Sequence, residues 1–287
     1  MMLQYIVWDV SPKIFTIGSF EVRWYGMFFA LSFFLGFYFV SKFFKKEGVP
    51  AGLLDKLTIY MFIGTLIGAR LGHCLFYQPD IYLADPIKIL YVWEGGLASH
   101  GAFIGIVLSL YIFHRIDKIS LWWVLDRIVI VTALAAFFIR TGNLMNSEII
   151  GTESTVPWAF KFVRNPDYAN GYHHPSQLYE AIFYLGVFIF LFWSYYRKDA
   201  QIKGGLFFGY FLILVFGFRF FIEFLKESQV EFENSMTLNM GQWLSIPVVL
   251  LGIFMIFFSA KRGVEIALKD EPAANEPEPG TGEITQL

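Results

Sequence analysis

The chain changes from apolar to strongly polar at Arg140-Thr-Gly142-Asn143-Leu-Met-Asn146-Ser-Glu148-Ile-Ile-Gly151. Residues 129–139, directly before this stretch, are uncharged and almost wholly apolar, whereas the stretch places an arginine, two asparagines and a glutamate within nine positions. Ionisable groups at membrane depth are costly and usually face a partner, a cavity or a ligand. The pattern predicts that a membrane-spanning helix ends here and that the polar cluster meets an anionic substrate carrying a phosphate group.

The composition of the whole chain indicates that a lipid bilayer is its solvent. Of the 287 residues, 56% are hydrophobic and only 16% are charged, and the mean hydropathy is +0.54, whereas a soluble domain carries about 25% charged residues. The net charge is -2 and no basic tract is interleaved with aromatic residues, so nothing suggests nucleic-acid binding. The single cysteine, Cys74, excludes an internal disulfide and a cysteine-based metal site, and we interpret it as a small apolar residue within a helix.

Apolar windows of about 20 residues predict helices that cross the membrane, because a helix rises about 1.5 Å per residue and the hydrocarbon is about 30 Å thick. We expect an all-α, polytopic membrane helix bundle with seven spans, at residues 24–44, 54–77, 96–114, 120–140, 176–196, 205–225 and 239–260. The third span is weakened by Gly101 and Gly105, although glycines are common in membrane helices because they let two backbones approach closely.

The basic residues predict the orientation of the bundle. Twelve lysines and arginines follow the odd-numbered spans and seven lie on the other side, and an excess of basic residues marks the cytoplasmic side. We therefore expect the N-terminus outside, the C-terminus in the cytoplasm and the Arg140 cluster at the outer face. The connection 141–175 is too polar for a span and too long for a turn, so it should form extracytoplasmic loop elements.

The regions outside the spans divide the chain into three parts. Residues 1–22 lack the basic start and apolar core of a cleavable signal, and the alternation around Gly18-Ser19 favours a short hairpin, so we interpret them as an extracytoplasmic arm. Residues 23–262 form the membrane domain. Residues 263–287 form a cytoplasmic tail, which should be mostly disordered because the stretch from Lys269 is polar, rich in proline and unable to bury a core.

Polar residues gather on the outer half of the predicted bundle, which is the strongest sign of a function. Tyr25 opens the first span, Arg70 lies in the second, His100 begins the third, and Arg219 and Glu223 form an i,i+4 pair in the sixth. The planar guanidinium of arginine binds phosphate through two parallel hydrogen bonds and stays charged away from water. With the polar stretch at the end of the fourth span, these groups suggest a phospholipid headgroup as ligand, and a histidine is a suitable base beside it.

Each of these polar groups also has a simpler interpretation. Arg219 and Glu223 could be a structural ion pair, and His100 could be a hydrogen-bonding residue at a helix end. Asn143 and Asn146 could merely cap the broken end of the fourth span. The occurrence of all of them on one side of the bundle favours a functional site.

Other residues and patterns narrow the chemistry. His173-His174 lacks an acidic partner at ligand spacing, so we expect no metal site. Arg127 lies near the cytoplasmic end of the fourth span, and we expect it to reach the membrane surface with Asp126 as its partner. The sequence contains no Walker loop, nucleophilic elbow or zinc-binding helix, which favours direct displacement on a lipid over a covalent intermediate.

The polar blocks resemble those of the bacterial prolipoprotein diacylglyceryl transferases, over about residues 8–260. They are Arg23-Trp-Tyr25-Gly26, Gly68-Ala-Arg70, Gly95-Gly96-Leu-Ala-Ser-His100-Gly101, Arg140-Thr-Gly142-Asn143-Leu-Met-Asn146-Ser-Glu148 with Gly151, His174-Pro175-Ser176-Gln177-Leu178-Tyr179-Glu180, Phe218-Arg219-Phe-Phe-Ile-Glu223-Phe and Gly241-Gln242-Trp-Leu-Ser245-Ile-Pro247. One block alone would be weak, but the set in this order is specific to that family.

The resemblance implies a reaction, its substrates and a location. The family transfers the diacylglyceryl group of phosphatidylglycerol to the lipobox cysteine thiol in the signal peptide of a prolipoprotein, forming a thioether and releasing glycerol phosphate. This first step of lipoprotein maturation takes place in the bacterial cytoplasmic (inner) membrane, with the active site towards the outer leaflet. The implied partners are phosphatidylglycerol, the prolipoprotein signal peptide and membrane lipids, with no cofactor, metal or nucleic acid.

The resemblance also assigns roles to residues of this chain. The catalytic residues that it implies are His100, Arg140 and Arg219. The residues that it implies for substrate binding are Tyr25, Asn143, Asn146, Glu148 and Gly151, and Gly142 belongs to the same family signature. We add Arg70 and Glu223 from the residues themselves, because Arg70 is an ionisable group deep in a span and Glu223 would hold Arg219.

A mechanism for that reaction follows as a hypothesis. Only a few per cent of a free cysteine is thiolate at neutral pH, so a base is needed. His100 is our candidate, with Arg219 or the substrate phosphate as alternatives. Arg140 and Arg219 would stabilise the charge that develops on the leaving phosphate. A lipid-binding transporter or scramblase is the alternative function, but the two halves show no internal repeat and seven spans do not divide evenly.

The sequence departs from the family pattern at four positions. The family often has glycine before the signature arginine, and usually has glycine between the second asparagine and the glutamate, where this chain has Ile139 and Ser147. Arginine often follows the last signature glycine, and a second glycine commonly follows His-Gly, where this chain has Thr152 and Ala102. These departures concern the geometry of the loops rather than the class of reaction.

Overall fold

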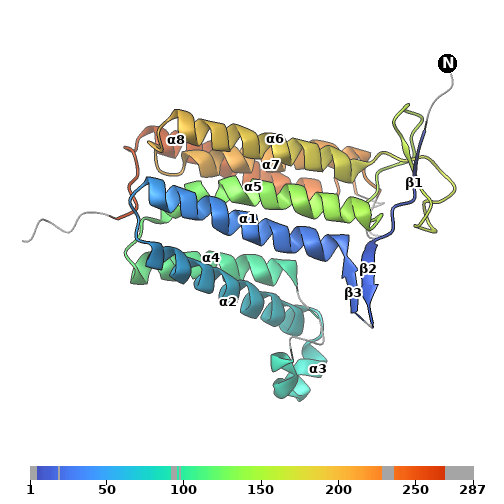
Figure 1. Ribbon diagram of the computed structural model, residues 1–287, viewed down its shortest axis with the longest axis horizontal. Coiled ribbons are helices and arrows are strands. Elements are labelled where there is room, and N and C mark those ends of the chain that lie inside the picture. Colours follow the sequence, from blue (N-terminus) through green and yellow to red (C-terminus); the bar gives the residue numbers. More distant parts are fainter. Residues whose placement is uncertain (1–4, 19, 92–95, 97, 228–235, 269–287) are drawn as a thin grey trace, which may run out of the picture.

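The computed structural model of the protein describes residues 5–18, 20–91, 96, 98–227 and 236–268. Long helices lie side by side in an elongated bundle, shown in Figure 1. The elements are, in order, β1 (Ile6–Trp8), β2 (Lys13–Ile17), β3 (Phe20–Arg23), α1 (Trp24–Lys46), α2 (Ala51–Phe76), α3 (Pro79–Ala84), η1 (Pro86–Leu90), α4 (Ser99–Ile116), α5 (Leu121–Met145), β4 (Phe160–Phe162), α6 (Ser176–Arg197), α7 (Leu206–Ile222), η3 (Glu223–Leu225) and α8 (Met240–Ala260).

Six helices of the described chain are long and apolar enough to cross a membrane, which makes this a multi-pass membrane protein by length and composition. They are α1, α2, α5, α6, α7 together with η3, and α8. The expected third span corresponds to α4, a shorter apolar helix. Gly96 has a φ of +72° and lies outside the helix, which begins at Ser99. The 18 residues of α4 therefore extend about 27 Å, slightly less than the hydrocarbon thickness of about 30 Å.

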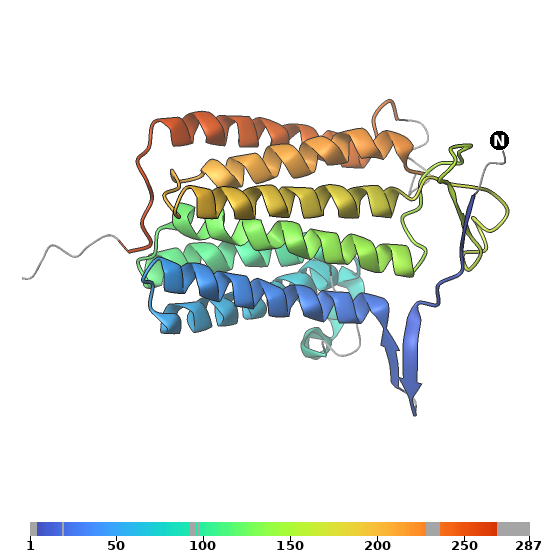
Figure 2. The ribbon, with the colours of Figure 1, turned by 45° about the horizontal axis from the view of Figure 1, so that its top comes forward.

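Helix α5 lies at the centre of the bundle and packs against α1, α6 and α7. Half of its most apolar window is buried inside the protein, compared with 22% for α1, α2 and α8. Figure 2 shows α1 and α2 on one side of α5, and α6, α7 and α8 on the other. A central helix can carry polar residues that face protein rather than lipid, and α5 is the helix that ends in the Arg140 stretch.

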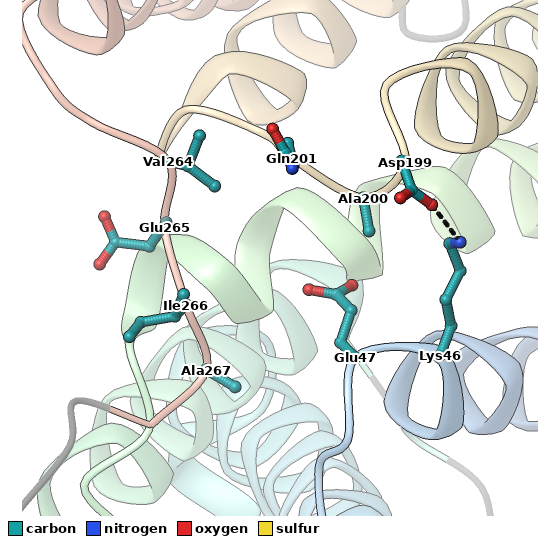
Figure 3. Close-up of a pocket in the computed structure, with 9 residues that line it drawn as sticks. All are labelled: Lys46, Glu47, Asp199, Ala200, Gln201, Val264, Glu265, Ile266 and Ala267. Atoms are coloured by element: carbon teal, nitrogen blue, oxygen red, sulfur yellow. Dashed lines mark hydrogen bonds and ion pairs between the residues drawn. The ribbon is translucent and has the colours of Figure 1, made fainter.

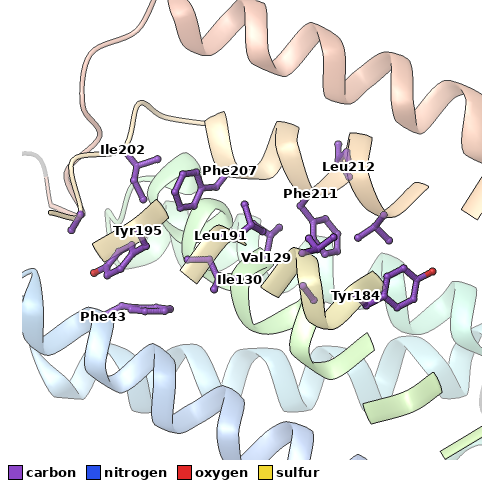
Figure 4. Packing of buried hydrophobic residues seen from close by; sticks show 14 residues of the cluster. Phe43, Val129, Ile130, Tyr184, Leu191, Tyr195, Ile202, Phe207, Phe211 and Leu212 are labelled. Atoms are coloured by element: carbon purple, nitrogen blue, oxygen red, sulfur yellow. The ribbon is translucent and has the colours of Figure 1, made fainter. Parts of the chain in front are cut away.

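Bulky apolar side chains fill the space between α5, α6 and α7. Ile130, Leu191 and Phe207, one from each helix, are fully buried in the same cluster, which Figure 4 shows from close by. Lipid tails are as apolar as these side chains, so the hydrophobic effect does not drive the helices together within a bilayer. The contacts stabilise the bundle through close van der Waals packing instead. This packing fixes the register of the three helices and therefore the relative positions of the polar residues at their ends.

Helices α2 and α4 pack with their backbones in direct contact. A Cβ atom added at Gly101 would lie 2.1 Å from the carbonyl oxygen of Gly68, and one added at Gly105 would lie 1.9 Å from that of Gly64. Any larger residue would therefore force the two helices apart. The glycines that weaken the third span in sequence terms thus allow the close approach that is typical of small residues between membrane helices.

Four short strands in the described chain lie at the end of the bundle where α5 finishes, so the fold is mostly rather than wholly helical. Strands β2 and β3 form an antiparallel hairpin around Gly18, as the sequence predicts, and β1 pairs in parallel with β4 from the connection 141–175. Glu21 pairs across the hairpin with Lys13 and also with Arg23. The hydrogen bonds from these two donors hold the pKa of the Glu21 carboxyl below its usual value.

Asp126 caps the start of α7 rather than serving as the partner of Arg127. Its buried carboxylate accepts hydrogen bonds from the backbone N–H groups of Gly205 at 2.7 Å and Phe208 at 2.9 Å. The first N–H groups of a helix have no partner within the helix and carry partial positive charge, so they are well suited to bind a carboxylate. The pairing expected from the sequence is therefore wrong.

Arg127 is instead a buried residue that pairs with Glu47 at the end of α1. Its Nε and Nη2 atoms lie 3.0 and 2.6 Å from the two carboxylate oxygens of Glu47, and its side chain is 1% exposed. Trp123 and Tyr195 donate two more hydrogen bonds to the same carboxylate, at 2.6 and 2.7 Å. Arg127 therefore joins α1, α5 and the chain at the end of α6 through Glu47 and the backbone carbonyl of Ala200.

A polar pocket of about 360 Å³ adjoins Glu47 at this end of the bundle (Figure 3). Lys46 and Asp199, which line it, form an ion pair at 2.5 Å. The last described residues, 261–268, cross this end and bond to the residue before α5, Ser120. Because Ser120 precedes Arg140 by 20 positions along α5, the two ends are about 30 Å apart. The pocket is thus remote from the polar stretch.

Candidate functional site

The last turn of α5 and the residues that follow it form a hydrogen-bonded unit, residues 140–151, which we call the signature turn. Arg140 Nη1 donates to Asn143 Oδ1 at 3.3 Å. The side-chain amides of Asn143 and Asn146 donate to the same oxygen of Glu148, at 2.7 and 3.3 Å. The chain folds back so that Glu148 lies over the helix end. Four residues predicted for the site are therefore joined by direct contacts.

Side chains from other segments satisfy the backbone carbonyl groups at the end of α5. The carbonyls of residues 144, 147, 148 and 149 each accept a side-chain hydrogen bond. The four donors are Trp8, Asn165, Gln177 and Ser176. Backbone polar groups at membrane depth must find partners within the protein, and these four side chains provide them here. Asn146 is itself the C-cap residue of α5, and its backbone N–H bonds to the carbonyls of Gly142 and Leu144. The side-chain amides of Asn143 and Asn146 bond to Glu148 instead of the helix end, so capping describes the main chain of Asn146 but not these side chains.

Two residues of the signature turn have a left-handed backbone conformation although neither is glycine. The φ angle is +54° at Ser147 and +59° at Ile149. The Ser147 hydroxyl is buried and has no hydrogen-bond partner in the described structure. A side chain in this backbone conformation costs about 1–2 kcal/mol, so glycine would occupy the position of Ser147 with less strain.

Replacing Ser147 with glycine should stabilise the protein by about 1 kcal/mol, because glycine adopts positive φ without strain and the unpartnered hydroxyl is removed. The measurement is the denaturation midpoint in detergent, with turnover followed in parallel. Ser154→Gly is the matched control, since Ser154 lies in the same connection and its φ is not positive. A midpoint that falls in Ser147→Gly as it does in the control would contradict the strain argument.

Five charged side chains form a continuous series from α5 to the end of α7, which we call the charge chain. Glu180 Oε2 lies 3.1 Å from Arg140 Nε, and Glu180 Oε1 lies 3.1 Å from Lys226 Nζ. Lys226 Nζ also lies 3.1 Å from Glu223 Oε1, which is 3.6 Å from Arg219 Nε. The predicted pairing of Arg219 with Glu223 is confirmed, and two arginines 79 positions apart in sequence belong to one network.

Two glycines of the signature turn mark close contacts between segments. A Cβ atom at Gly142 would lie 2.8 Å from Cδ2 of Tyr25, so the start of α1 rests on the last turn of α5. A Cβ atom at Gly151 would lie 2.5 Å from the carbonyl oxygen of Leu225 and 2.6 Å from that of His174. Tyr25 is thereby placed beside the signature turn, and Gly151 lets the connection 141–175 meet the end of α7.

Arg70 belongs to a separate group on α2. Its side chain is buried and donates to the backbone carbonyl groups of Lys88 at 2.6 Å and Ile89 at 2.9 Å. Its guanidinium also stacks on the ring of Tyr82, 5.0 Å from the centroid. These contacts hold the segment that contains α3 and η1 to α2, so the structure places Arg70 in a different network from Arg140.

His100 stands in the first turn of α4 and is exposed. Helix α4 packs on α2, and it begins at the end of the bundle where α5 finishes (Figure 1). His100 therefore lies at the same end of the bundle as Arg140 but on a different helix pair, and no contact among the described residues joins its ring to the charge chain. Residues 92–95 and 97, which precede it, lie outside the described residues.

Three residues of this site are missing from the sequence-based assignment: Glu180, Lys226 and Asn239. Asn239 Nδ2 donates to Glu223 Oε2 at 3.0 Å, and the side chains of Glu180 and Lys226 are 0% and 1% exposed. The sequence contains a weak signal for Lys226, which follows Glu223 by three positions as a neighbour on a helix would. Pairing between helices depends on their register, which a single sequence does not reveal.

A second hydrogen-bonded group flanks Gly151. The Tyr179 hydroxyl accepts from the Trp158 indole at 2.8 Å and lies 3.1 Å from His174 Nδ1. Burial lowers the pKa of the His174 imidazole, which favours the neutral ring, and a neutral imidazole has one ring nitrogen that accepts a hydrogen bond. Nowhere in the described ranges do three His, Cys, Asp or Glu side chains gather as a metal site would require.

An apolar cavity of about 610 Å³ lies between α1, α2 and α5. Phe37, Val40, Leu57 and Val131 are among the side chains that line it. Its lining residues on α5, between positions 128 and 135, precede Arg140 by 5–12 positions. The cavity therefore lies about 8–18 Å deeper along the helix than Arg140, and its size and lining suit a hydrocarbon chain.

The chain is similar to known proteins over almost its whole helical region. A family model described as prolipoprotein diacylglyceryl transferase matches residues 12–258. A phosphatidylglycerol–prolipoprotein diacylglyceryl transferase of Chloroherpeton thalassium is 48% identical over 259 residues, which cover 90% of this chain and 96% of the relative. Proteins of the same name from Porphyromonas gingivalis and Tolumonas auensis are 43% and 44% identical, over 91% and 89% of this chain and 96% and 98% of the relatives.

The matched region contains all ten residues that the sequence analysis assigns to the site, from Tyr25 to Glu223. It also contains every helix from α1 to α7 and nearly all of α8. The chain belongs to the prolipoprotein diacylglyceryl transferase family.

Proposed function

We propose that the protein transfers the diacylglyceryl group of phosphatidylglycerol to the lipobox cysteine of a prolipoprotein, forming a thioether and releasing glycerol phosphate. The observation that carries this proposal is the charge chain, which gathers Arg140 and Arg219 on buried carboxylates at one end of an apolar bundle. Similarity to relatives that bear the name of this activity supports the choice of substrates.

Arg140 and Arg219 bind the lipid phosphate in this proposal. Each arginine has its Nε atom within ion-pair distance of a glutamate, 3.1 Å from Glu180 for Arg140 and 3.6 Å from Glu223 for Arg219. A carboxylate on that side orients the planar guanidinium so that its terminal nitrogens can meet a phosphate. Negative charge grows on the phosphate oxygen as the carbon–oxygen bond breaks, so the arginines stabilise the transition state more than the ground state.

The residues around Arg140 hold it in place for this task. Asn143, Asn146 and Glu148 form the hydrogen-bonded series that begins at Arg140 Nη1. Tyr25 packs against the same helix turn at Gly142 and is suited to meet the headgroup from the side of α1. Gly151 contributes through the close contact that its missing side chain permits.

The reacting sulfur approaches from the second substrate, the signal peptide. The thiolate attacks the glyceryl carbon that carries the phosphate ester, the carbon–oxygen bond breaks, and its electron pair leaves with glycerol phosphate. His100 is the proposed acceptor of the thiol proton, because it is exposed in the first turn of α4, and α4 begins at the end of the bundle where α5 finishes. Arg219 and the substrate phosphate are the alternative groups for this step.

The apolar cavity between α1, α2 and α5 supplies a place for one acyl chain of the donor lipid. If the headgroup phosphate binds at Arg140, the cavity lies about 8–18 Å from it along the membrane normal. That range corresponds to the middle and end of a fatty acyl chain. Phe37 and Val131, from two of the three helices, lie on its wall.

The arrangement in the membrane follows from the same proposal. Helix α4 crosses as the third of seven spans, with Arg70 holding the segment before it to α2. The N-terminus lies outside and the C-terminus in the cytoplasm, so that the signature turn faces the outer leaflet of the bacterial inner membrane. Residues 1–22 then form an extracytoplasmic arm, 23–262 the catalytic domain and 263–287 a cytoplasmic tail. Accessibility of single cysteines to an impermeant thiol reagent in intact cells tests this orientation.

The decisive experiment combines the purified protein, phosphatidylglycerol vesicles and a lipobox peptide. A thioether-linked diacylglyceryl peptide, detected by mass spectrometry together with released glycerol phosphate, is the expected product. Movement of lipid between leaflets without modified peptide would instead favour a transporter or scramblase. A peptide with serine in place of the cysteine is the matched substrate control and should remain unmodified.

Replacing His100 with glutamine should lower the rate at pH 7 by about 30-fold, because only about 3% of an unassisted thiol is thiolate there. The loss should shrink as the pH approaches about 8.5, where the free thiol ionises without a base. The pH–rate profiles of the wild type and His100→Gln check this expectation. Matching profiles of similar height would exclude His100 as the base and leave Arg219 or the phosphate.

A further inference from the structure

Lys226 is the most deeply buried cation of the site, and it stands between two acidic side chains. Its side chain is 1% exposed, and its Nζ atom lies 3.1 Å from one carboxylate oxygen of Glu180 and 3.1 Å from one of Glu223. Both glutamates are also buried, with side chains 0% and 8% exposed. A buried ammonium is strongly disfavoured unless it is paired, and here one ammonium serves two carboxylates.

The same two carboxylates also face the arginines. Glu180 reaches Arg140 and Glu223 reaches Arg219. If Lys226 were absent, each glutamate would be balanced by one arginine alone, and the two pairs would be neutral. With Lys226 present the five groups carry three positive charges and two negative ones, so one positive charge remains for a ligand.

We propose that Lys226 is a positioning residue for the transfer reaction, which neutralises Glu180 and Glu223 so that Arg140 and Arg219 keep a surplus positive charge for the lipid phosphate. The inference rests on the proposed function, because a surplus charge matters only if an anion binds there. In a site of low dielectric one unit charge changes the interaction with phosphate strongly.

The backbone of Lys226 supports a second, purely structural role that the test must separate. Lys226 forms an isolated antiparallel bridge with Gly151, and the neighbouring Thr152 N–H donates to the Leu225 carbonyl at 2.9 Å. These contacts involve main-chain atoms and are retained when the side chain is changed. A side-chain substitution therefore reports on the ammonium group rather than on the bridge.

The test begins with Lys226→Met, which removes the charge and keeps an unbranched side chain of similar length. With the lipobox-peptide assay, kcat should fall by about 100-fold, the effect of losing one preorganised electrostatic contact. Lys226→Arg keeps the charge and should stay within about tenfold of the wild type. If the arginine variant loses as much as the methionine variant, charge is not the relevant property, and this comparison holds even when Lys226→Met folds poorly.

Charge-compensated double variants provide the sharpest readout. Lys226→Met combined with Glu180→Gln, or with Glu223→Gln, restores the net charge of the wild type and leaves no additional unpaired carboxylate. The kcat of each double variant should be at least tenfold higher than the kcat of Lys226→Met. The comparison is made per folded molecule, because removing an uncompensated carboxylate can also restore stability. A double variant that is no faster than Lys226→Met on that basis would overturn the proposal.

Besides Lys226, the groups that face these two carboxylates in the described structure are Arg140, Tyr184, Arg219 and Asn239. None of these four is changed in Lys226→Met or Lys226→Arg, so the difference in kcat between the two variants reports on the charge at position 226. Wild-type protein that forms no thioether product would reject the proposed function itself, which is a different outcome.

Discussion

Arg140→Gln should lower kcat by about 100–1000-fold, because one preorganised donor aimed at a developing negative charge contributes that much. Glutamine is polar and of similar length, but it has no positive charge and cannot bind phosphate through two parallel N–H donors. Arg140 also joins two networks, since its Nε faces Glu180 and its Nη1 bonds Asn143. The substitution therefore removes a phosphate ligand and leaves the Glu180 carboxylate with one cation fewer. The lipobox-peptide assay measures the loss.

Arg164→Gln is the matched control for this prediction. Arg164 lies in the connection 141–175, its side chain is 45% exposed, and it pairs with Asp9 on the surface. Exposed ion pairs contribute little, so kcat should be unchanged. Arg140→Lys separates charge from geometry, because it keeps the charge without the planar fork and should fall between wild type and glutamine. Near-normal turnover in Arg140→Gln would remove the central support of the proposed function.

The sequence predicts the site well wherever the relevant partners are close along the chain. Asn143, Asn146 and Glu148 follow Arg140 within eight positions, and the structure joins all four by hydrogen bonds. The pair Arg219 and Glu223 follows from helical spacing in the same way. Local spacing fixes such contacts because a helix places residues three and four apart on one face.

Contacts between helices could not be predicted from one sequence. Glu180 is 40 positions from Arg140 and 46 from Lys226, and it meets both only because α6 packs against α5 and α7 in a particular register. Arg70 illustrates the same limit, because the sequence marks a buried arginine at membrane depth without showing which groups it contacts. Its described contacts hold a neighbouring segment through two backbone carbonyls. Single-sequence reasoning finds polar residues at membrane depth but does not identify their partners.

The fold, like the site, is predicted where it depends on local sequence and is missed where it depends on contacts between distant segments. The long apolar windows in the sequence predict α1, α2 and α5 to α8, because a helix that spans the hydrocarbon needs about 20 consecutive apolar residues. The extent of α4 depends on where the chain leaves the turn at Gly96, and the sequence places that start three residues too early. The hairpin of β2 and β3 follows from local alternation, whereas the pairing of β1 with β4 joins residues more than 150 positions apart.

Arg127→Met should destabilise the protein by about 3–5 kcal/mol, because removing one partner of a buried ion pair leaves the other charge uncompensated. Glu47 would keep only the hydrogen bonds from Trp123 and Tyr195, which are neutral donors. Denaturant titration in mixed micelles measures the change in unfolding free energy. Arg127 precedes Arg140 by 13 positions, about 20 Å along α5, so kcat per folded molecule should not change.

Two further variants show whether the unpaired charge is the cause. Arg127→Met combined with Glu47→Gln leaves no isolated carboxylate, so it should be more stable than Arg127→Met alone, as expected for coupled residues. Glu21→Gln, which breaks an exposed ion-pair group in the β2–β3 hairpin, should not move the unfolding midpoint measurably. If the double variant is less stable than Arg127→Met, the arginine acts through packing across α1, α5 and α6. A fall in kcat per folded molecule would instead show that the two ends of α5 are coupled, which separate hydrogen-bond networks about 20 Å apart give no reason to expect.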